Sequence, residues 1–295
     1  MRILNFGSLN IDYVYSVGHI AAPGETIASS GRKVFYGGKG FNQSVAVSQA
    51  GVPVFHAGQV GPDGDGILAE CEKLGVDTSY IRKSEEETGH TFIQVDENGQ
   101  NSIVLFGGSN RSIRREHIDW VLSQFDARDV VILQNEINSL DYIISQAAKR
   151  GLMIILNPSP CDQAIAGCDL SKVGWLVLNE VEGEQLTGER EGQAILRGLA
   201  DRFPQTGLVL TLGSEGAFCW DGDETIYQPC FKVKPADTTA AGDTFLGYFA
   251  AGLAQGLPLR RSMERAAAAA AIAISREGGA PSIPNHGEVE RFLMA

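Results

Sequence analysis

Short hydrophobic runs alternate with amphipathic segments along most of the chain. Runs rich in Val, Ile and Leu include VVILQ at 130–134, MIILN at 153–157 and LVLTLG at 208–213, and a segment with helical periodicity, SLDYIISQAAKRG at 139–151, separates the first two. Apolar strands joined by helices are typical of a parallel sheet that is covered on both faces. The pattern predicts an α/β fold with a doubly wound, mostly parallel sheet flanked by helices.

Two segments, at about 12–36 and 90–106, break this rhythm. DYVYSVGHI with TIASSGRKVFY predicts one pair of strands, and HTFIQVDENGQNSIVLFGG predicts another pair around the turn ENGQ. No helix follows either pair, so we expect a small antiparallel sheet inserted into a single domain of residues 1–295. This sheet is interpreted either as a lid over a site or as an edge that pairs two copies of the chain in a homodimer.

The order of elements changes after about residue 213. GAFCWDG and ETIYQPCF predict two strands, and two consecutive helices follow in GDTFLGYFAAGLAQG and PLRRSMERAAAAAAIAISREG. HGEVERFL predicts a final helix near the end of the chain.

Composition narrows the class of protein. The 295 residues are 43% hydrophobic and carry a net charge of −12, which disfavours nucleic acid or an anionic membrane as a partner. The first residues, MRILNFGSLNID, predict a strand rather than a targeting segment, and the longest apolar run, at 266–274, is too short to cross a membrane. Five scattered cysteines suit neither a disulfide framework nor a metal site, so we expect a cytoplasmic protein.

One acidic residue, Asp243, stands in DTTAAGDTF, where small residues lead into an apolar helix. Small residues let a ligand approach the backbone, and the free N–H groups of a helix start stabilise an anion. A carboxylate beside a phosphate site is useful if it takes a proton from an attacking hydroxyl. The alternative is that Asp243 only interacts with the amides of the first helical turn.

A glycine-rich turn, YGGKGFNQS, precedes a predicted helix in the first fifth of the chain. Its glycine spacing fits neither the dinucleotide fingerprint nor the Walker phosphate loop. Backbone amides and the Asn42 carboxamide at one point suit a polyhydroxylated ligand, whereas an ordinary tight connection from strand to helix is the alternative.

Together, GGKGFNQS and DTTAAGDTFLG resemble the paired signatures of the ribokinase-type (PfkB) carbohydrate kinase family. The resemblance extends over nearly the whole chain and includes GSLNID, NPSP, LNEVE, TLGSEG and REGGAPSIP. It implies a ribokinase-like fold and the ATP-dependent transfer of a phosphoryl group to a primary hydroxyl of a sugar. Ribose is the expected acceptor, and deoxyribose, a hexose or a nucleoside such as adenosine are the alternatives.

The resemblance also implies roles for individual residues. Asp243 is expected to be the catalytic base, with Ala240, Ala241 and Gly242 forming an anion hole for the transferred group. The positions expected to hold sugar hydroxyls are Asn10, Asp12, Gly38, Lys39, Asn42 and Glu136. For Asn10 and Asp12, placed at the end of the first strand, a turn-forming role is the alternative. Glu136 follows an apolar strand, and for it a solvated loop carboxylate is the alternative.

The nucleotide and its ions are expected on the other side of Asp243. Residues Asn179, Thr211, Gly213, Gly216 and Gly242 are expected at the nucleotide, with Glu182 acting on Mg²⁺ through water. Asn179 and Glu182 also match a helix start, with Asn as the cap and Glu in the first turn. A monovalent cation site for K⁺ is implied at Asp237, Thr239, Ala273, Arg276, Gly278 and Ser282.

Three departures from the family pattern are expected to affect which sugar is accepted and not the phosphoryl transfer itself. Phe41 replaces a small residue in the glycine-rich turn and could narrow the sugar pocket, and Tyr248 replaces Ala or Gly on the helix after Asp243. His90, in a predicted lid strand, is expected either to contact substrate or to face solvent. A catalytically silent sugar or nucleotide sensor is the rival interpretation, and a nucleotide-binding oxidoreductase lacks the glycine spacing it needs.

Overall fold

The computed structural model describes residues 1–295 and contains a central sheet of nine strands in the order β13-β12-β11-β10-β9-β8-β1-β4-β5. The strands are parallel from β11 to β5, and β12 and β13 are added antiparallel at one edge. This confirms the predicted α/β class. The strands are β1 (Ile3–Phe6), β4 (Val54–Val60), β5 (Val76–Lys83), β8 (Val130–Gln134), β9 (Met153–Asn157), β10 (Trp175–Asn179), β11 (Gly207–Thr211), β12 (Ala217–Trp220) and β13 (Thr225–Gln228).

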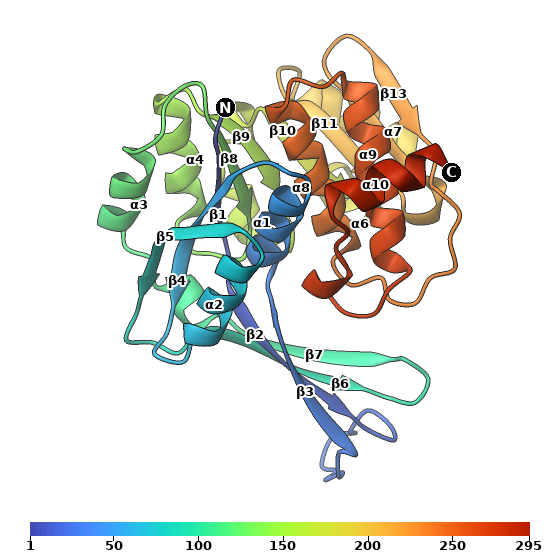
Figure 1. The fold of residues 1–295 in the computed structure, drawn as a ribbon. Coiled ribbons are helices and arrows are strands. Elements are labelled where there is room, and N and C mark those ends of the chain that lie inside the picture. The colour runs from blue at the N-terminus through green and yellow to red at the C-terminus, as the bar shows by residue number, and fades with distance from the viewer.

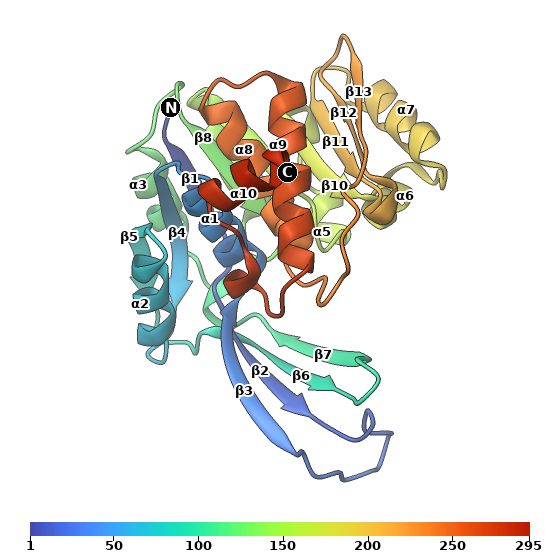
Figure 2. The same ribbon diagram turned by 45° about the vertical axis from the view of Figure 1, so that its right-hand side comes forward.

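Helices cover both faces of this sheet (Figures 1 and 2). One face carries α1 (Lys39–Gln49), α2 (Asp65–Lys73), α8 (Ala241–Ala254), α9 (Leu259–Ile274) and α10 (His286–Met294). The other carries α3 (Arg115–Leu122), α4 (Leu140–Lys149), α5 (Gln163–Ala166) and α7 (Gly192–Arg202), while α6 (Glu180–Thr187) follows β10. Short 3₁₀ turns are η1 (Gly108–Arg111), η2 (Leu170–Lys172), η3 (Gly213–Glu215) and η4 (Ala280–Ser282).

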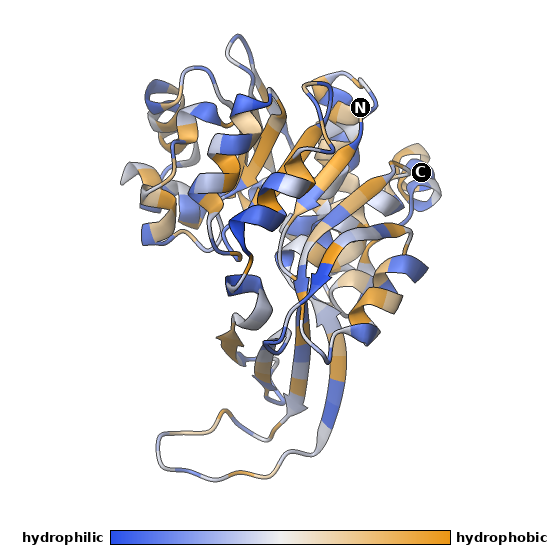
Figure 3. Cartoon of the chain, turned by 90° about the vertical axis from the view of Figure 1, so that its left-hand side faces the viewer, coloured by the Kyte–Doolittle hydropathy of each residue, from blue (hydrophilic) through white to orange (hydrophobic).

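The strand sequences explain the two layers of helices. Successive residues of a strand point to opposite faces, so Ile3 joins the core under α1 and α8 whereas Leu4 joins the core under α3 and α4. All of β8 is buried, from Val130 to Gln134, because helices lie on both sides of it. In Figure 3 the central strands are largely hydrophobic, as a doubly covered sheet requires.

A second sheet of four strands projects from the carboxyl ends of the central strands (Figure 2). Its order is β3-β2-β6-β7, with β2 (Asn10–Ser16), β3 (Gly31–Gly37), β6 (Gly89–Val95) and β7 (Asn101–Phe106). We call these strands the small sheet. Its two outer pairs are antiparallel, as expected, but the middle pair β2–β6 is parallel, so the sheet is mixed. The chain builds α1, β4, α2 and β5 in the main body between β3 and β6, and this long crossover lets β6 enter in the same direction as β2.

Helices α1 and α8 pack directly against each other under the central sheet. Gly247 makes this contact close, because a Cβ there would lie 2.4 Å from the Cβ of Ala46. The start of each helix faces the small sheet, so the glycine-rich turn and the segment before Asp243 come together although about 200 residues separate them. No helix of the chain has the length and apolar character needed to cross a membrane.

Candidate functional site

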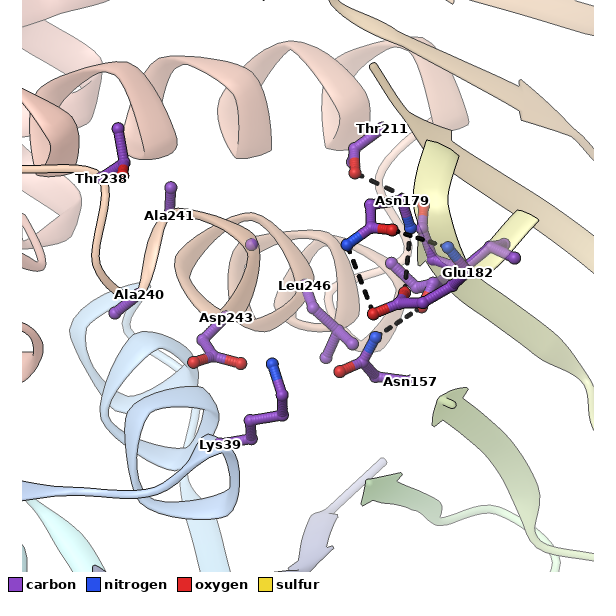
Figure 4. A pocket seen from close by; sticks show the side chains of 13 residues that line it. Lys39, Asn157, Asn179, Glu182, Thr211, Thr238, Ala240, Ala241, Asp243 and Leu246 are labelled. Atoms are coloured by element: carbon purple, nitrogen blue, oxygen red, sulfur yellow. Dashed lines mark hydrogen bonds between the residues drawn. The ribbon is translucent and has the colours of Figure 1, made fainter. Parts of the chain in front are cut away.

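A pocket of about 230 Å³ lies at the carboxyl edge of the central sheet. Strands β9, β10 and β11 supply one wall, and the starts of α1 and α8 supply the other (Figure 4). This is where open α/β sheets bind ligands. The lining residues are Lys39, Asn157, Val177, Leu178, Asn179, Glu182, Thr211, Thr238, Ala240, Ala241, Gly242, Asp243 and Leu246.

The start of α8 offers unpaired backbone donors to this pocket. Ala240 is the N-cap with φ 59°, a left-handed conformation that is uncommon for a residue with a Cβ, and it has no side-chain oxygen to cap the helix. The N–H groups of Gly242 and Asp243 find no acceptor within the chain, whereas Ala241 N–H donates to Thr238 O over 3.3 Å. Free amides at a helix start attract an anion.

Asp243 does not cap its own helix. Its two carboxylate oxygens accept instead from α1, with Asn42 Nδ2 at 3.1 Å and Gln43 Nε2 at 2.9 Å. The side chain is 7% exposed and lies in the pocket wall. These contacts contradict the interpretation of Asp243 as a simple helix-start residue, because its partners come from another helix.

Lys39 extends from the start of α1 toward Asp243 and stands among carboxylates (Figure 4). Burial lowers the pKa of Lys39, but the charges of Asp243, Glu136 and Glu182 outweigh burial and raise it. Glu136 lies two residues beyond β8 and accepts from Ser8 Oγ and from Lys39 N–H. Burial raises the pKa of Glu136, against the opposing effects of Lys39 and Ser8. The ammonium group is therefore charged and available to a phosphate oxygen.

Asn10 and Asp12 lie in β2 of the small sheet, not at the end of the first strand as expected, because β1 already ends at Phe6. Asn10 Oδ1 accepts from Asn110, and Asp12 Oδ1 accepts from Thr91. Burial raises the pKa of Asp12, and the Thr91 hydrogen bond lowers it by less. Neither residue plays the turn-forming role that was the alternative.

Gly38 and Gly40 allow the glycine-rich turn to lie close to β2. Gly38 has φ 92°, and a Cβ there would lie 3.3 Å from the backbone nitrogen of Asn10. Gly40 already belongs to α1, and a Cβ there would be 2.4 Å from Ser8 N. Larger residues would push the sugar-side groups apart, so the glycines bring Asn10, Lys39 and Glu136 together.

Asn179 and Glu182 form a capping box at the start of α6. Asn179 Oδ1 accepts from Glu182 N–H at 2.9 Å, and Glu182 Oε2 accepts from Asn179 N–H at 3.0 Å. Both still line the pocket with Thr211, so the structural role does not remove them from it. No three His, Cys, Asp or Glu side chains cluster anywhere in the chain.

Gly213 and Gly216 lie next to the pocket rather than in its wall. They belong to the 3₁₀ turn after β11, and both have positive φ, 53° and 98°. A Cβ at Gly216 would lie 2.3 Å from Gln228 O, whereas the space around Gly213 is open. The missing side chain of Gly216 thus allows close packing against β13, and the missing side chain of Gly213 leaves open space beside Thr211.

The residues expected at the cation site lie in the loop before α8 and in the segment from the end of α9 to η4, and a hydrogen bond joins these two segments. Asp237 Oδ1 accepts from the N–H and hydroxyl of Thr239, and its Oδ2 accepts from Gly278 N–H at 3.0 Å. Burial raises the pKa of Asp237, but these hydrogen bonds outweigh it and lower the pKa. Ser282 Oγ donates to Gly279 O, and Arg276 pairs with Glu288, so these two side chains point to other partners. The carbonyl of Ala273 accepts from Arg276 N–H at 3.0 Å.

The departures from the family pattern lie away from the pocket. Phe41 is fully buried in the core beneath α1, so it does not narrow the sugar side as expected. Tyr248 is buried too, and its hydroxyl donates to Pro284 O at 2.7 Å. The His90 ring packs against Phe92 and Phe106 on the small sheet.

Three polar residues of the site were missed in the sequence. Asn157 ends β9 and lines the pocket, and Gln43 and Gln134 lie buried behind Asp243. A signal existed for Asn157 and Gln134, since each is a polar residue that ends an apolar strand, as Asn179 does. Gln43 lies in the GGKGFNQS signature, but its contact with Asp243 depends on the packing of α1 against α8.

Known proteins resemble this chain over its whole length. The family described as pfkB family carbohydrate kinase matches residues 2–286. The ribokinase of Haemophilus influenzae is 34% identical and covers 97% of this chain and 96% of its own length. The crystal structure of the ribokinase of Thermotoga maritima is 35% identical with a TM-score of 0.89 and covers 100% of this chain and 99% of that one. The structure of the Arabidopsis thaliana ribokinase complexed with ribose and ATP is 28% identical with a TM-score of 0.86. The match covers 100% of this chain and 99% of that one. The chain belongs to the pfkB family of carbohydrate kinases.

Proposed function

We propose that the chain is an ATP-dependent ribose kinase that transfers the γ-phosphoryl group of ATP to a primary hydroxyl of the sugar. One observation carries the proposal: the Asp243 carboxylate and the unpaired N–H groups of Gly242 and Asp243 stand together at the start of α8 and line one pocket. A proton acceptor beside an anion-binding helix start suits the attack of an alcohol on a phosphoryl group.

In this reaction, the hydroxyl oxygen approaches the γ-phosphorus in line with the leaving oxygen while Asp243 accepts the hydroxyl proton. The free backbone amides of Gly242 and Asp243 and the Lys39 ammonium stabilise the charge that develops on the phosphoryl oxygens. Closure of the small sheet over the sugar would exclude water and limit ATP hydrolysis, which makes it a lid.

The sugar would lie between the small sheet and the start of α1. Asn10, Asp12, Gly38 and Glu136 surround this space, and Asn42 has a buried Oδ1 with no partner in the chain. An unpaired buried carbonyl is costly, and a sugar hydroxyl would satisfy it. The nucleotide would occupy the pocket toward Asn179, Thr211 and Gly213.

Two ions are part of the proposal. Glu182 would hold Mg²⁺ through water, and the ion would neutralise charge on the phosphates. The carbonyls around Asp237 and Gly278 would hold K⁺ next to the start of α8, where the loop of residues 237–240 leads into the anion hole.

Exposed apolar side chains support a homodimer through the small sheet. Val34, Phe92 and the run Ile103–Phe106 are all 45–64% exposed, and every one of them lies in this sheet. Val34, Phe92, Val104 and Phe106 share one face of the sheet, whereas Ile103 and Leu105 point to the other. An exposed apolar face of this kind marks an interface. The proposed occupant is a second copy of the small sheet.

The acceptor is tested by a panel of ribose, deoxyribose, hexoses and nucleosides with ATP, Mg²⁺ and K⁺, in which kcat/KM is measured from ADP release. Ribose is expected to give the highest value. A higher value for deoxyribose, a hexose or adenosine would replace ribose as the substrate, and no sugar-dependent ADP release with any acceptor would favour a catalytically silent sensor.

A further inference from the structure

Two neighbouring amides of α1 hold the carboxylate of Asp243, one on each oxygen. Asn42 Nδ2 donates to Oδ2 and Gln43 Nε2 donates to Oδ1. Gln43 is fully buried, and Asn42 and Asp243 are 7% exposed. The two amides differ in their other contacts, because Asn42 Oδ1 has no partner whereas Gln43 Oε1 has one.

A chain of buried hydrogen bonds continues behind Gln43 into the central sheet. Gln134 Nε2, at the end of β8, donates to Gln43 Oε1 at 2.7 Å and to Asn5 Oδ1 of β1 at 2.9 Å. Asn5 Nδ2 donates in turn to Gly40 O at 2.8 Å and to Ser44 Oγ at 2.9 Å. Gln134 and Asn5 are fully buried, so no water competes for these contacts.

The chain of hydrogen bonds ends on a neutral ring. Ser44 Oγ lies 2.8 Å from His56 Nδ1, and His56 Nε2 lies 3.2 Å from Gly7 O. Burial lowers the pKa of His56 to about 4, so at neutral pH one ring nitrogen donates to Gly7 and the other accepts from Ser44. This series of contacts contains no second charged group, and the only charge it meets is that of Asp243.

The direction of every hydrogen bond in this series is therefore determined. Because Gly7 O accepts only, His56 donates to it, Ser44 donates to His56, and Asn5 must present its NH₂ to Ser44. Gln134 must then present its NH₂ to Asn5 and to Gln43, which leaves the Gln43 NH₂ for Asp243. Asp243 therefore accepts from Gln43 through Oδ1 while it accepts from Asn42 through Oδ2.

We infer that Gln43 is a positioning residue for the phosphoryl transfer: anchored by Gln134 and Asn5, its amide holds the Asp243 carboxylate in one orientation. The inference rests on the proposed function, in which Asp243 accepts the hydroxyl proton. Gln43 does not touch the reacting atoms. Asn42 can turn toward a sugar, since its oxygen is unpaired, whereas both ends of the Gln43 amide are already bonded.

The first test is Gln43→Met, which keeps the length of the side chain and removes its donor. We expect kcat to fall by about tenfold to hundredfold, because a loosened base spends less time in line, while KM for ATP changes by less than about threefold. Gln59→Met is the matched control, because Gln59 is a buried glutamine that contacts Ser112 rather than Asp243.

The second test reverses the polarity of the contact. Gln43→Glu places two carboxylates together, so its Tm should fall at pH 8 and recover at pH 5, where one of them can take a proton. Adding Asp243→Asn should restore the Tm at pH 8, because the carboxamide introduced at position 243 then donates to the carboxylate introduced at position 43, while turnover stays low. This rescue is a coupling between the two sites that independent structural effects do not produce.

The outcomes separate the two proposals. If Asp243→Asn keeps wild-type turnover, the proposed base is wrong whatever Gln43 does. If Asp243→Asn loses turnover but Gln43→Met keeps the wild-type kcat, as Gln59→Met should, then only the positioning role of Gln43 is overturned. Absence of the Tm rescue at pH 8 overturns that role as well.

Discussion

The backbone N–H of Lys39 donates to Oε2 of Glu136 over 2.9 Å, which fixes the first residue of α1 to the end of β8. This contact holds a half-buried carboxylate beside the start of α1, whose Lys39 side chain extends toward Asp243. We therefore expect substitutions of Glu136 to change both the thermal stability of the fold and the KM for the sugar.

Glu136→Gln should stabilise the fold at neutral pH and weaken sugar binding. The folded pKa of Glu136 is raised by burial, so its contribution to stability is present below its ordinary value of 4.5 and is lost as pH rises. The variant does not titrate at this position, so its Tm should exceed that of the wild type at pH 8 and exceed it by a smaller margin at pH 4. KM for the sugar should rise about tenfold.

Thermal unfolding at several pH values, with sugar kinetics at pH 8, checks this prediction. A Tm difference that stays constant from pH 4 to pH 8 would contradict the raised pKa, and an unchanged KM would remove Glu136 from the sugar side.

Asp243→Asn should lower turnover by at least about a hundredfold while sugar and ATP still bind. The fold should tolerate the change, because the unpaired Oδ1 of Asn42 can turn to accept from the new amide. ADP release measures turnover, and calorimetry measures binding. Near-normal turnover in this variant would exclude Asp243 as the proton acceptor.

Glu182→Gln should weaken the response to Mg²⁺ and leave the helix start intact. Glutamine still closes a capping box, so the Tm should change little. The Mg²⁺ concentration for half-maximal velocity should rise about tenfold. The reason is that the uncharged glutamine would bind the water molecules around the metal more weakly than the Glu182 carboxylate. Glu288→Gln makes the same change in the capping box of α10, outside the pocket, and should not alter the Mg²⁺ response. Equal Mg²⁺ responses in the two variants would argue against the role of Glu182.

Asp237→Ala should abolish activation by K⁺. The substitution removes the acceptor that joins the Thr239 loop to Gly278, and the carbonyls around a cation would no longer be held in place. The ratio of rates in K⁺ and in choline should fall toward one, and this ratio does not depend on how much of the protein is folded. A ratio equal to that of the wild type would mean that this loop does not bind the cation.

Val104→Glu should convert the dimer into a monomer. Val104 is 64% exposed on β7, and a charge placed in the proposed interface would be desolvated without a partner. Val181→Glu is the control, since Val181 is 60% exposed on α6 and should leave the dimer intact. Light scattering after gel filtration gives the mass, and a wild-type chain that runs as a monomer would contradict the proposal.

Local patterns in the sequence are sufficient to specify the class of fold and most of the candidate site. Hydrophobic runs and helical periods predict the central strands, α4, α8 and α9, because burial on both faces leaves its pattern in each segment. The motifs around Asp243, Lys39 and Asn179 are also readable, since small residues, glycines and a capping pair each have a local physical cause.

Which residues meet depends instead on tertiary packing. The parallel pairing of β2 with β6 requires a long crossover, and the burial of Phe41 follows from how α1 packs against the sheet. The hydrogen bonds from Asn42 and Gln43 to Asp243 join residues that lie 201 and 200 positions apart. A contact between residues so far apart along the chain produces no periodic pattern in the sequence. Its energy depends on the packing of two helices and not on either segment alone.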